Sequence, residues 1–243
     1  MALPKLNAHI NYKMKIPSTG QMVEYRPYLV KEEKVMMQAM ESNDRNIMLD
    51  TLAKTIEACL INSDVSVRTL TMFDIDYMFL KIRAKSVGET TEVGLKCAED
   101  GCETSTPITI NFDDIKAPTP KGKKGPYIVE LTDDVHLELK FPSYGDLQRL
   151  ISMPENTDQV EASFTMVRAC LSAIMQGDNR FMVEDHTEEE ISDFISNFTS
   201  GQFKMIQDFI NTIPELTHEV KWVCEGCGAK NKEVLKGTAD FFQ

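Results

Sequence analysis

Two stretches of similar design carry the strongest structural signal in the sequence. Residues 91–112 read TEVGLKCAEDGCETSTPITINF, and residues 217–236 read THEVKWVCEGCGAKNKEVLK. In each stretch, a pair of cysteines lies between two segments whose apolar and polar residues alternate. Alternation with a period of two indicates strands, so each stretch predicts a β-hairpin that carries its cysteines in the turn.

The two hairpins together predict a structural zinc site. A strand, a tight turn with a cysteine at each end and a return strand form a zinc knuckle, and two knuckles supply the four sulfur ligands of a closed tetrahedral site. The predicted ligands are Cys97, Cys102, Cys224 and Cys227. Because 121 residues lie between Cys102 and Cys224, the site has to be assembled from distant parts of the chain. Four thiolates leave no open position for water or substrate, so such a zinc is structural.

Other interpretations of the cysteines agree less well with the sequence. A disulfide within each pair conflicts with a chain of cytosolic character. A redox CxxC motif usually opens a helix, whereas Cys224–Cys227 follows a strand. Unliganded core cysteines are the main alternative to zinc. The remaining two, Cys59 and Cys170, fall on the apolar stripes of predicted helices, and we expect them to be small core side chains.

The composition indicates a soluble globular protein. The chain has 243 residues, 42% of them hydrophobic, and its 26 Lys and Arg against 38 Asp and Glu give a formal charge of −12. This acidic balance disfavours generic nucleic-acid binding. No apolar run approaches the roughly 18 residues of a membrane span, and the first residues lack a secretory signal. We therefore expect no integral membrane association, and a cytoplasmic location at least while the protein is made.

The N-terminal stretch differs from the rest in charge. Residues 1–31 contain five basic side chains and one acidic side chain, a net of +4, together with three prolines. Residues 1–30 therefore predict an extended basic arm with apolar anchors such as Ile10, Tyr12 and Tyr25. Such an arm either lies on its own acidic body or grips a neighbouring subunit, and the sequence leaves both possibilities open.

The remaining periodicity predicts an α+β fold. Helical segments over residues 31–87 and 142–214 surround a β-rich segment, residues 88–141, and residues 215–243 pack back on that segment. Asp74 is the expected cap of one helix, Thr187 and Glu190 form an expected capping box, and residues 157–176 predict one long helix. A hairpin is expected over residues 127–141. The split cysteine site resembles a zinc ribbon.

Motifs for catalysis are missing from the sequence. It contains no Walker loop, GxSxG, GxGxxG or HExxH pattern. The four histidines are interpreted as surface or hairpin residues, and the acidic clusters as turn and helix-start residues. They are His9, His136, His186 and His218. We therefore expect no catalytic residues, no cofactor-binding residues apart from the zinc ligands, and no enzymatic activity.

Several segments resemble a known family. They are YLVKEEK at 28–34, FDIDYMFL at 73–80, RAKSVGE at 83–89, the cysteine pairs and the ending CEGCG…FF. Together they are similar to the T4-type phage baseplate protein family, over nearly the whole chain. The resemblance implies a non-enzymatic role in virion assembly, as a hub component of the tail baseplate or as a chaperone-like factor that helps to assemble the hub. The expected location is the host cytoplasm during assembly, and the virion tail as well if the protein is a hub component. Other baseplate or tail proteins are then the expected partners, with residues 1–30 as the expected contact.

Two alternative functions have partial support in the sequence. A zinc-ribbon factor that associates with nucleic acid, such as a transcription accessory protein, has a small basic loop at Lys121, Lys123 and Lys124 in its favour and the overall charge against it. A metal hydrolase would use His136 or His218. In addition, Met36, Met37, Met40 and Met48 cluster in the first two predicted helices, where they either form an adaptable interface or fill an irregular core.

Overall fold

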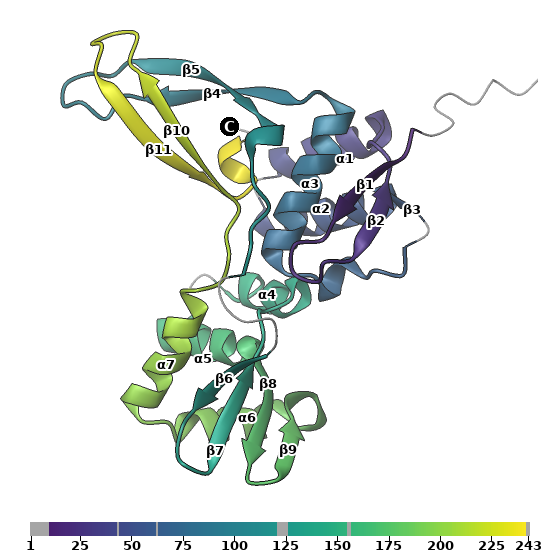
Figure 1. Ribbon diagram of the computed structural model, residues 1–243, viewed down its shortest axis with the longest axis vertical. Helices are drawn as coiled ribbons and strands as arrows, with labels where there is room; N and C mark the ends of the chain where they lie inside the picture. The colour runs from purple at the N-terminus through teal and green to yellow at the C-terminus, as the bar shows by residue number, and fades with distance from the viewer. Residues whose placement is uncertain (1–9, 43, 62, 121–125, 155–156, 242–243) are drawn as a thin grey trace, which may run out of the picture. The chain divides into compact units, whose positions relative to one another are not determined.

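The computed structural model describes residues 10–42, 44–61, 63–120, 126–154 and 157–241. The chain divides into two compact units. The first comprises Met1–Val67, Phe73–Thr119 and Glu215–Gln243, and the second comprises Arg68–Met72 and Pro120–Pro214. Figure 1 shows the elements of each unit along the chain. Among the described residues, no helix has both the length and the apolar character required to cross a membrane.

The N-terminal residues of the first unit fold into a small sheet. Strands β1 (Tyr12–Lys15) and β2 (Met22–Tyr25) form an antiparallel hairpin, and β2 also pairs with the short strand β3 (Leu60–Ile61). Met14 and Tyr25 are buried. The described part of the predicted arm is therefore not extended, and it docks on its own unit. Its alternating apolar residues are buried on one face of the sheet, and this burial favours the hairpin over an extended tail in solvent.

Three helices follow this sheet in the first unit. They are α1 (Val30–Glu41), α2 (Arg45–Cys59) and α3 (Met72–Ser86), with the short helix η1 (Val67–Thr69) before α3. Asp44 caps α2 by accepting hydrogen bonds from the amides of Asn46 and Ile47. The prediction that Asp74 caps a helix is wrong, because α3 begins two residues before it, at Met72. The buried carboxylate of Asp74 instead accepts hydrogen bonds from the amide and hydroxyl of Ser18.

Two long β-ribbons complete the first unit. The first ribbon consists of β4 (Thr90–Lys96) and β5 (Ser105–Asn111), and the second of β10 (Thr217–Val223) and β11 (Lys230–Lys236). The short helices η2 (Phe112–Asp114) and η4 (Ala239–Phe241) follow them. The ribbons pack against each other and against the C-terminal half of α3, as Figure 1 shows. Trp222 and Phe241 belong to this shared core.

The second unit is a four-stranded antiparallel sheet packed against helices. Its sheet has the order β6-β7-β8-β9, formed by Tyr127–Glu130, Val135–Leu139, Leu171–Gln176 and Asn179–Met182. Its helices are α4 (Tyr144–Ile151), α5 (Gln159–Cys170), α6 (Glu188–Ser196) and α7 (Ser200–Ile210), with η3 (Val183–Asp185) before α6. Helices α5, α6 and α7 share one apolar core with β7 and β8.

The predictions for this unit are only partly correct. The hairpin within residues 127–141 and the Thr187–Glu190 capping box are confirmed. The long helix over residues 157–176 is wrong, because α5 ends at Cys170 and the chain continues directly as β8. Leu171 and Ile174 suit a helical stripe by spacing, but the edge of β7 provides hydrogen-bond partners that override local periodicity. The molecule as a whole is a mixed α and β protein with small antiparallel sheets, in agreement with the α+β prediction.

Candidate metal centre

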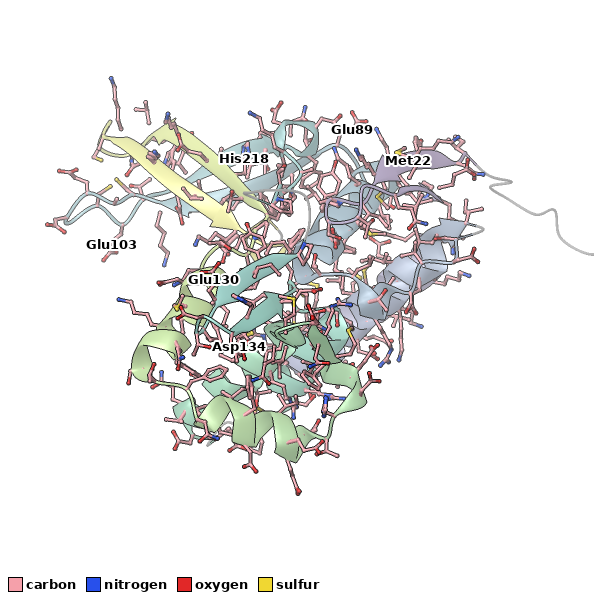
Figure 2. All side chains as sticks on the ribbon, turned by 60° about the horizontal axis from the view of Figure 1, so that its bottom comes forward. Met22, Glu89, Glu103, Glu130, Asp134 and His218 are labelled. Carbon is pink, nitrogen blue, oxygen red and sulfur yellow. The ribbon has the colours of Figure 1, made fainter. Side chains whose placement is uncertain are left out.

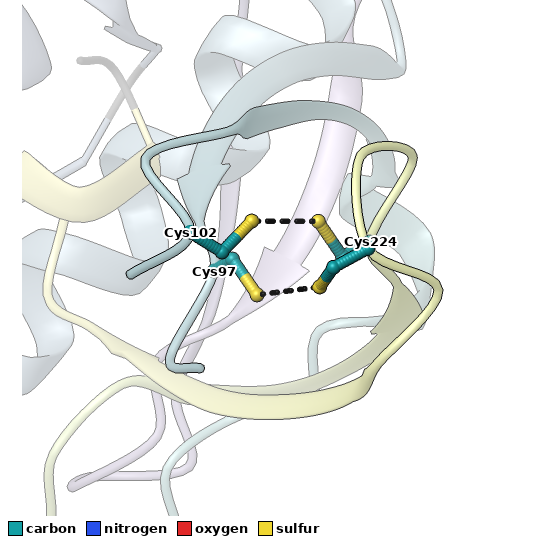
Figure 3. Close-up of side chains that lie close together, drawn as sticks. Cys97, Cys102 and Cys224 are labelled. Carbon is teal, nitrogen blue, oxygen red and sulfur yellow. Dashed lines mark hydrogen bonds between the residues drawn. The ribbon is translucent and has the colours of Figure 1, made fainter. Parts of the chain in front are cut away.

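The two ribbons bring the four predicted cysteines together at their turns. Figure 3 shows that Cys97 and Cys102 of the first ribbon face the pair from the second ribbon. Figure 2 marks the two ends of the first ribbon, with Glu89 near α3 and Glu103 in the cysteine-bearing turn. All four sulfur atoms lie within 4.8 Å of one another. The prediction that the two hairpins meet is therefore confirmed.

The sulfur positions match the size of a tetrahedral metal site. The Sγ atoms of Cys97 and Cys227 are 3.6 Å apart, and those of Cys102 and Cys224 are 3.7 Å apart. Zinc–sulfur bonds of about 2.3 Å place the sulfurs of an ideal tetrahedron about 3.8 Å apart. A disulfide needs about 2.05 Å between its sulfurs, and all six cysteines are free thiols. The donor set therefore fits a tetrahedral ion that prefers sulfur.

Polar hydrogens point at the sulfurs. The amides of Glu99 and Gly226 lie 3.5 Å from the sulfur of Cys97 and 3.4 Å from that of Cys224, respectively. The side-chain amide of Asn231 donates to the sulfur of Cys97 at 3.6 Å. Such donors stabilise thiolate charge and orient ligands, which is the usual role of the groups that surround a metal centre.

Hydrogen bonds across the ribbons hold the two turns in register. The Oδ1 atom of Asn231 accepts a hydrogen bond from the amide of Ala98 at 2.9 Å. The hydroxyl of Thr106 accepts one from the amide of Glu225 at 3.3 Å. Asn231 is 7% exposed and Thr106 is 3% exposed, so water competes little for these bonds.

A close steric contact also fixes the approach of the two turns. A β-carbon added at Gly226 would lie 2.2 Å from the hydroxyl oxygen and 3.0 Å from the β-carbon of Thr104. No real side chain occupies such a position without displacing its neighbour. Glycine at 226 therefore allows the second turn to lie directly against the first.

The thiols of the centre differ in acidity. Hydrogen bonds from the amides of Cys227 and Gly226 lower the pKa of the Cys224 thiol to about 6. The Thr104 hydroxyl likewise lowers the pKa of Cys102. The amide of Ala229 lowers the pKa of Cys227, but the hydrogen bond with Cys97 and the other thiols outweighs it and raises that pKa to about 12. The lowered pKa of Cys224 favours its thiolate, which is the form of cysteine that binds a metal ion.

The other residues singled out in the sequence lie elsewhere. Cys59 and Cys170 are fully buried, and burial raises their pKa values to about 11 and 12, so they are core side chains as predicted. His136 lies on β7 and His218 on β10, and within the described ranges neither joins three or more converging metal-ligating side chains. His9 and the basic loop at Lys121, Lys123 and Lys124 lie outside the described residues.

Sequence reasoning missed the residues that support the cysteines. Asn231 and Thr106 act across the ribbons, whereas Thr104 supports Cys102 of its own ribbon and also contacts the opposite turn at Gly226. Asn231 and Thr106 offer a clue, because each occupies an inward-facing position of its strand where the alternation predicts an apolar residue. A buried amide at such a position requires a polar partner.

The fold and the site define a class of protein in which two β-ribbons from distant parts of the chain are joined at a four-cysteine centre. The chain belongs to the family described as T4 bacteriophage base plate protein, whose model matches residues 9–243. It is thus a structural or assembly protein of the phage baseplate, and the predicted family is confirmed. No curated protein and no solved structure matches the chain.

Proposed function

We propose that this baseplate protein is a non-enzymatic hub component or hub assembly factor, with a structural zinc ion at its four cysteines. The observation that carries the proposal is the convergence of four sulfurs, within 4.8 Å, from two ribbons far apart along the chain. When bound, zinc supplies a cross-link between the ribbons, and the four cysteines hold it with no coordination position left for a reactant.

The cysteine centre suits a scaffold for other subunits. A metal that joins the ribbons fixes the surface they present, since structural zinc sites contribute on the order of 10 kcal/mol to folding. We infer that the contact with other tail proteins expected through residues 1–30 is made by exposed apolar side chains near the N-terminal hairpin. Ile10 is 71% exposed and Met22 is 59% exposed, so both are available to another chain.

A role in nucleic-acid binding has weaker support. The outer face of the second ribbon carries Lys221, Lys230, Lys232 and Lys236. However, Glu219 forms ion pairs with Lys221 and Lys232, and Glu215 forms one with Lys236. These two carboxylates offset half of the positive charge of the four lysines, and phosphate binding requires a surplus of cations.

Three measurements test the proposal. Elemental analysis of the full-length protein, purified without chelator, should give one zinc ion per chain, and a metal content near zero would refute the zinc assignment. Isolation of the tagged protein from infected cells should recover other baseplate proteins, with weaker recovery for Met22→Asp. Mass spectrometry of finished particles then separates the two roles, because a hub component remains in the virion and an assembly factor does not.

The absence of catalysis is tested separately. His136→Ala and His218→Ala should support phage production at the wild-type level when they replace the native protein. Loss of phage production with a well-folded variant would support the alternative function of a metal hydrolase.

A further inference from the structure

An apolar surface on the first two helices is independent of the cysteine centre. Along α1, Met37 is 60% exposed, Met40 is 51% exposed and Val30 is 79% exposed, while Ile47 and Met48 of α2 are 47% and 39% exposed. Of these side chains, Met37, Met40 and Met48 border a groove of about 360 Å³. Its walls include Met36, Met37 and Met40 of α1, Met48 and Leu52 of α2, and Phe79 of α3. Figure 1 shows these three helices side by side.

The clustered methionines form an exposed surface beside the groove. Three of the four clustered methionines are substantially exposed, so they do not simply fill an irregular core. Exposed apolar patches of this kind mark interaction surfaces, and methionine adapts its shape to a facing side chain.

The exposed face of α1 also carries charges of opposite sign at its two ends. At about 100° per residue, Val30, Lys34, Met37 and Glu41 fall within about 60° of one another around the helix. Lys34 and Glu41 are two turns apart, about 10 Å along the axis, with Met37 between them. Both are exposed, and neither has an ion-pair partner in the part of the chain that the structure describes.

We propose that this face is the contact between two copies of the chain, related by a two-fold axis that crosses α1 near Met37. Such an axis runs the two α1 helices antiparallel, and it places Lys34 of each copy beside Glu41 of the other. The protruding side chains of Met37 and Met40 then enter the groove of the opposite copy. The face is thus complementary to itself in both charge and shape, which is what an isologous dimer requires.

The test is the oligomeric state of the full-length protein, measured by sedimentation equilibrium over a range of concentrations. We expect a monomer–dimer equilibrium. Met37→Glu should weaken the dimer at least a hundredfold, because each interface contains the substitution twice and buries the added charge. The matched control is Met205→Glu on α7, whose methionine is 42% exposed and lies outside the proposed surface. It should leave the dimer constant unchanged.

A charge exchange tests the geometry itself. Lys34→Glu and Glu41→Lys should each weaken the dimer about tenfold, since each creates two like-charge contacts. The double variant Lys34→Glu/Glu41→Lys should recover to within about threefold of the wild type, because both charges reverse together. Lys204→Glu on α7 serves as the control for net charge. Circular dichroism verifies that every variant is folded.

Three results would overturn the proposal. The first is a wild-type chain that stays monomeric at every soluble concentration. A monomer that binds a different tail protein through this groove counts as this result too. The second is a dimer that is indifferent to Met37→Glu. The third is a double variant that remains as weak as the single charge reversals. All of these are read from the association constant, so they leave the zinc and baseplate assignments untouched.

Discussion

The two cysteine ribbons have similar sequences, but their turns and bases are built differently. The first ribbon continues directly from α3 and places four residues between its cysteines. The second ribbon places two residues between its cysteines, and a buried aspartate on α3 anchors its base. Its turn is also the more crowded one, because Gly226 lies against Thr104. The first ribbon thus follows directly from α3, whereas the second is held to the rest of the unit by side-chain contacts and by the proposed metal.

The largest expected effect comes from breaking the metal link. Cys224→Ser should abolish zinc binding and unfold both ribbons, a loss on the order of 10 kcal/mol in the apparent free energy of folding of this region. Elemental analysis and hydrogen exchange of residues 217–236 measure the two consequences together. The matched control is Cys59→Ala, which removes a buried thiol from α2 but should retain the zinc. A Cys224→Ser variant that binds zinc normally would contradict the four-cysteine centre.

The anchor of the second ribbon should be sensitive to pH. The hydroxyl of Thr238 donates a hydrogen bond to the Asp76 carboxylate at 3.1 Å. Burial raises the pKa of Asp76 from 3.8 to about 6, although the contacts with Thr238 oppose this rise. Because the folded-state pKa lies above the unfolded-state value, the contribution of this group to stability is greatest below pH 4. That contribution is lost as the pH rises through 6.

Asp76→Asn removes this titration. Relative to the variant, the wild type should lose stability between about pH 4 and 6, by at most roughly 3 kcal/mol. Denaturant unfolding of both proteins at several pH values, with zinc in excess, measures the difference. The wild type serves as the reference at each pH, so any effect of protons on the thiols cancels. A difference that does not vary with pH would show that Asp76 ionises as freely as an exposed aspartate.

Steric crowding at the second turn gives a smaller effect. Gly226→Ala should cost about 2–3 kcal/mol of folding free energy, because its new methyl group displaces Thr104 and pushes the turns apart. The cost should fall in a Thr104→Ala background, because this substitution removes the hydroxyl and the methyl group of Thr104 and leaves only its β-carbon near the new side chain. A double-mutant cycle on unfolding free energies measures this coupling. Equal costs in both backgrounds would mean that the turns do not approach as closely as described.

Local sequence patterns predicted much of the fold and the cysteine site. Alternation on both sides of each cysteine pair predicted the ribbons, and the side chains of Thr187 and Glu190 predicted the start of α6. These signals succeed because the interactions they describe lie within a few residues of one another.

Long-range contacts account for what was missed. The strand β8 is stabilised by pairing with β7, and Asp74 is held by Ser18, 56 residues earlier in the chain. The N-terminal hairpin did have a local signal, since Tyr12, Met14 and Ile16 alternate and Val23 and Tyr25 follow. The basic charge and the prolines led to the prediction of an extended arm instead. Asn231 and Thr106 support the cysteines across the ribbons, at separations in sequence that no spacing rule covers.

The smallest expected effect separates backbone conformation from crowding. Gly101 of the first turn and Gly228 of the second both have positive φ, +81° and +75°, and a β-carbon at either position would meet nothing within 4 Å. Gly101→Ala and Gly228→Ala should therefore cost similar amounts, about 1–2 kcal/mol each, from backbone strain alone. Both variants should retain the full zinc content. Denaturant unfolding of the two variants beside Gly226→Ala makes the comparison. If Gly228→Ala alone proved as costly as Gly226→Ala, the second turn would be rigid in its backbone as well as in its packing, and the difference between the ribbons would be larger than steric contact explains.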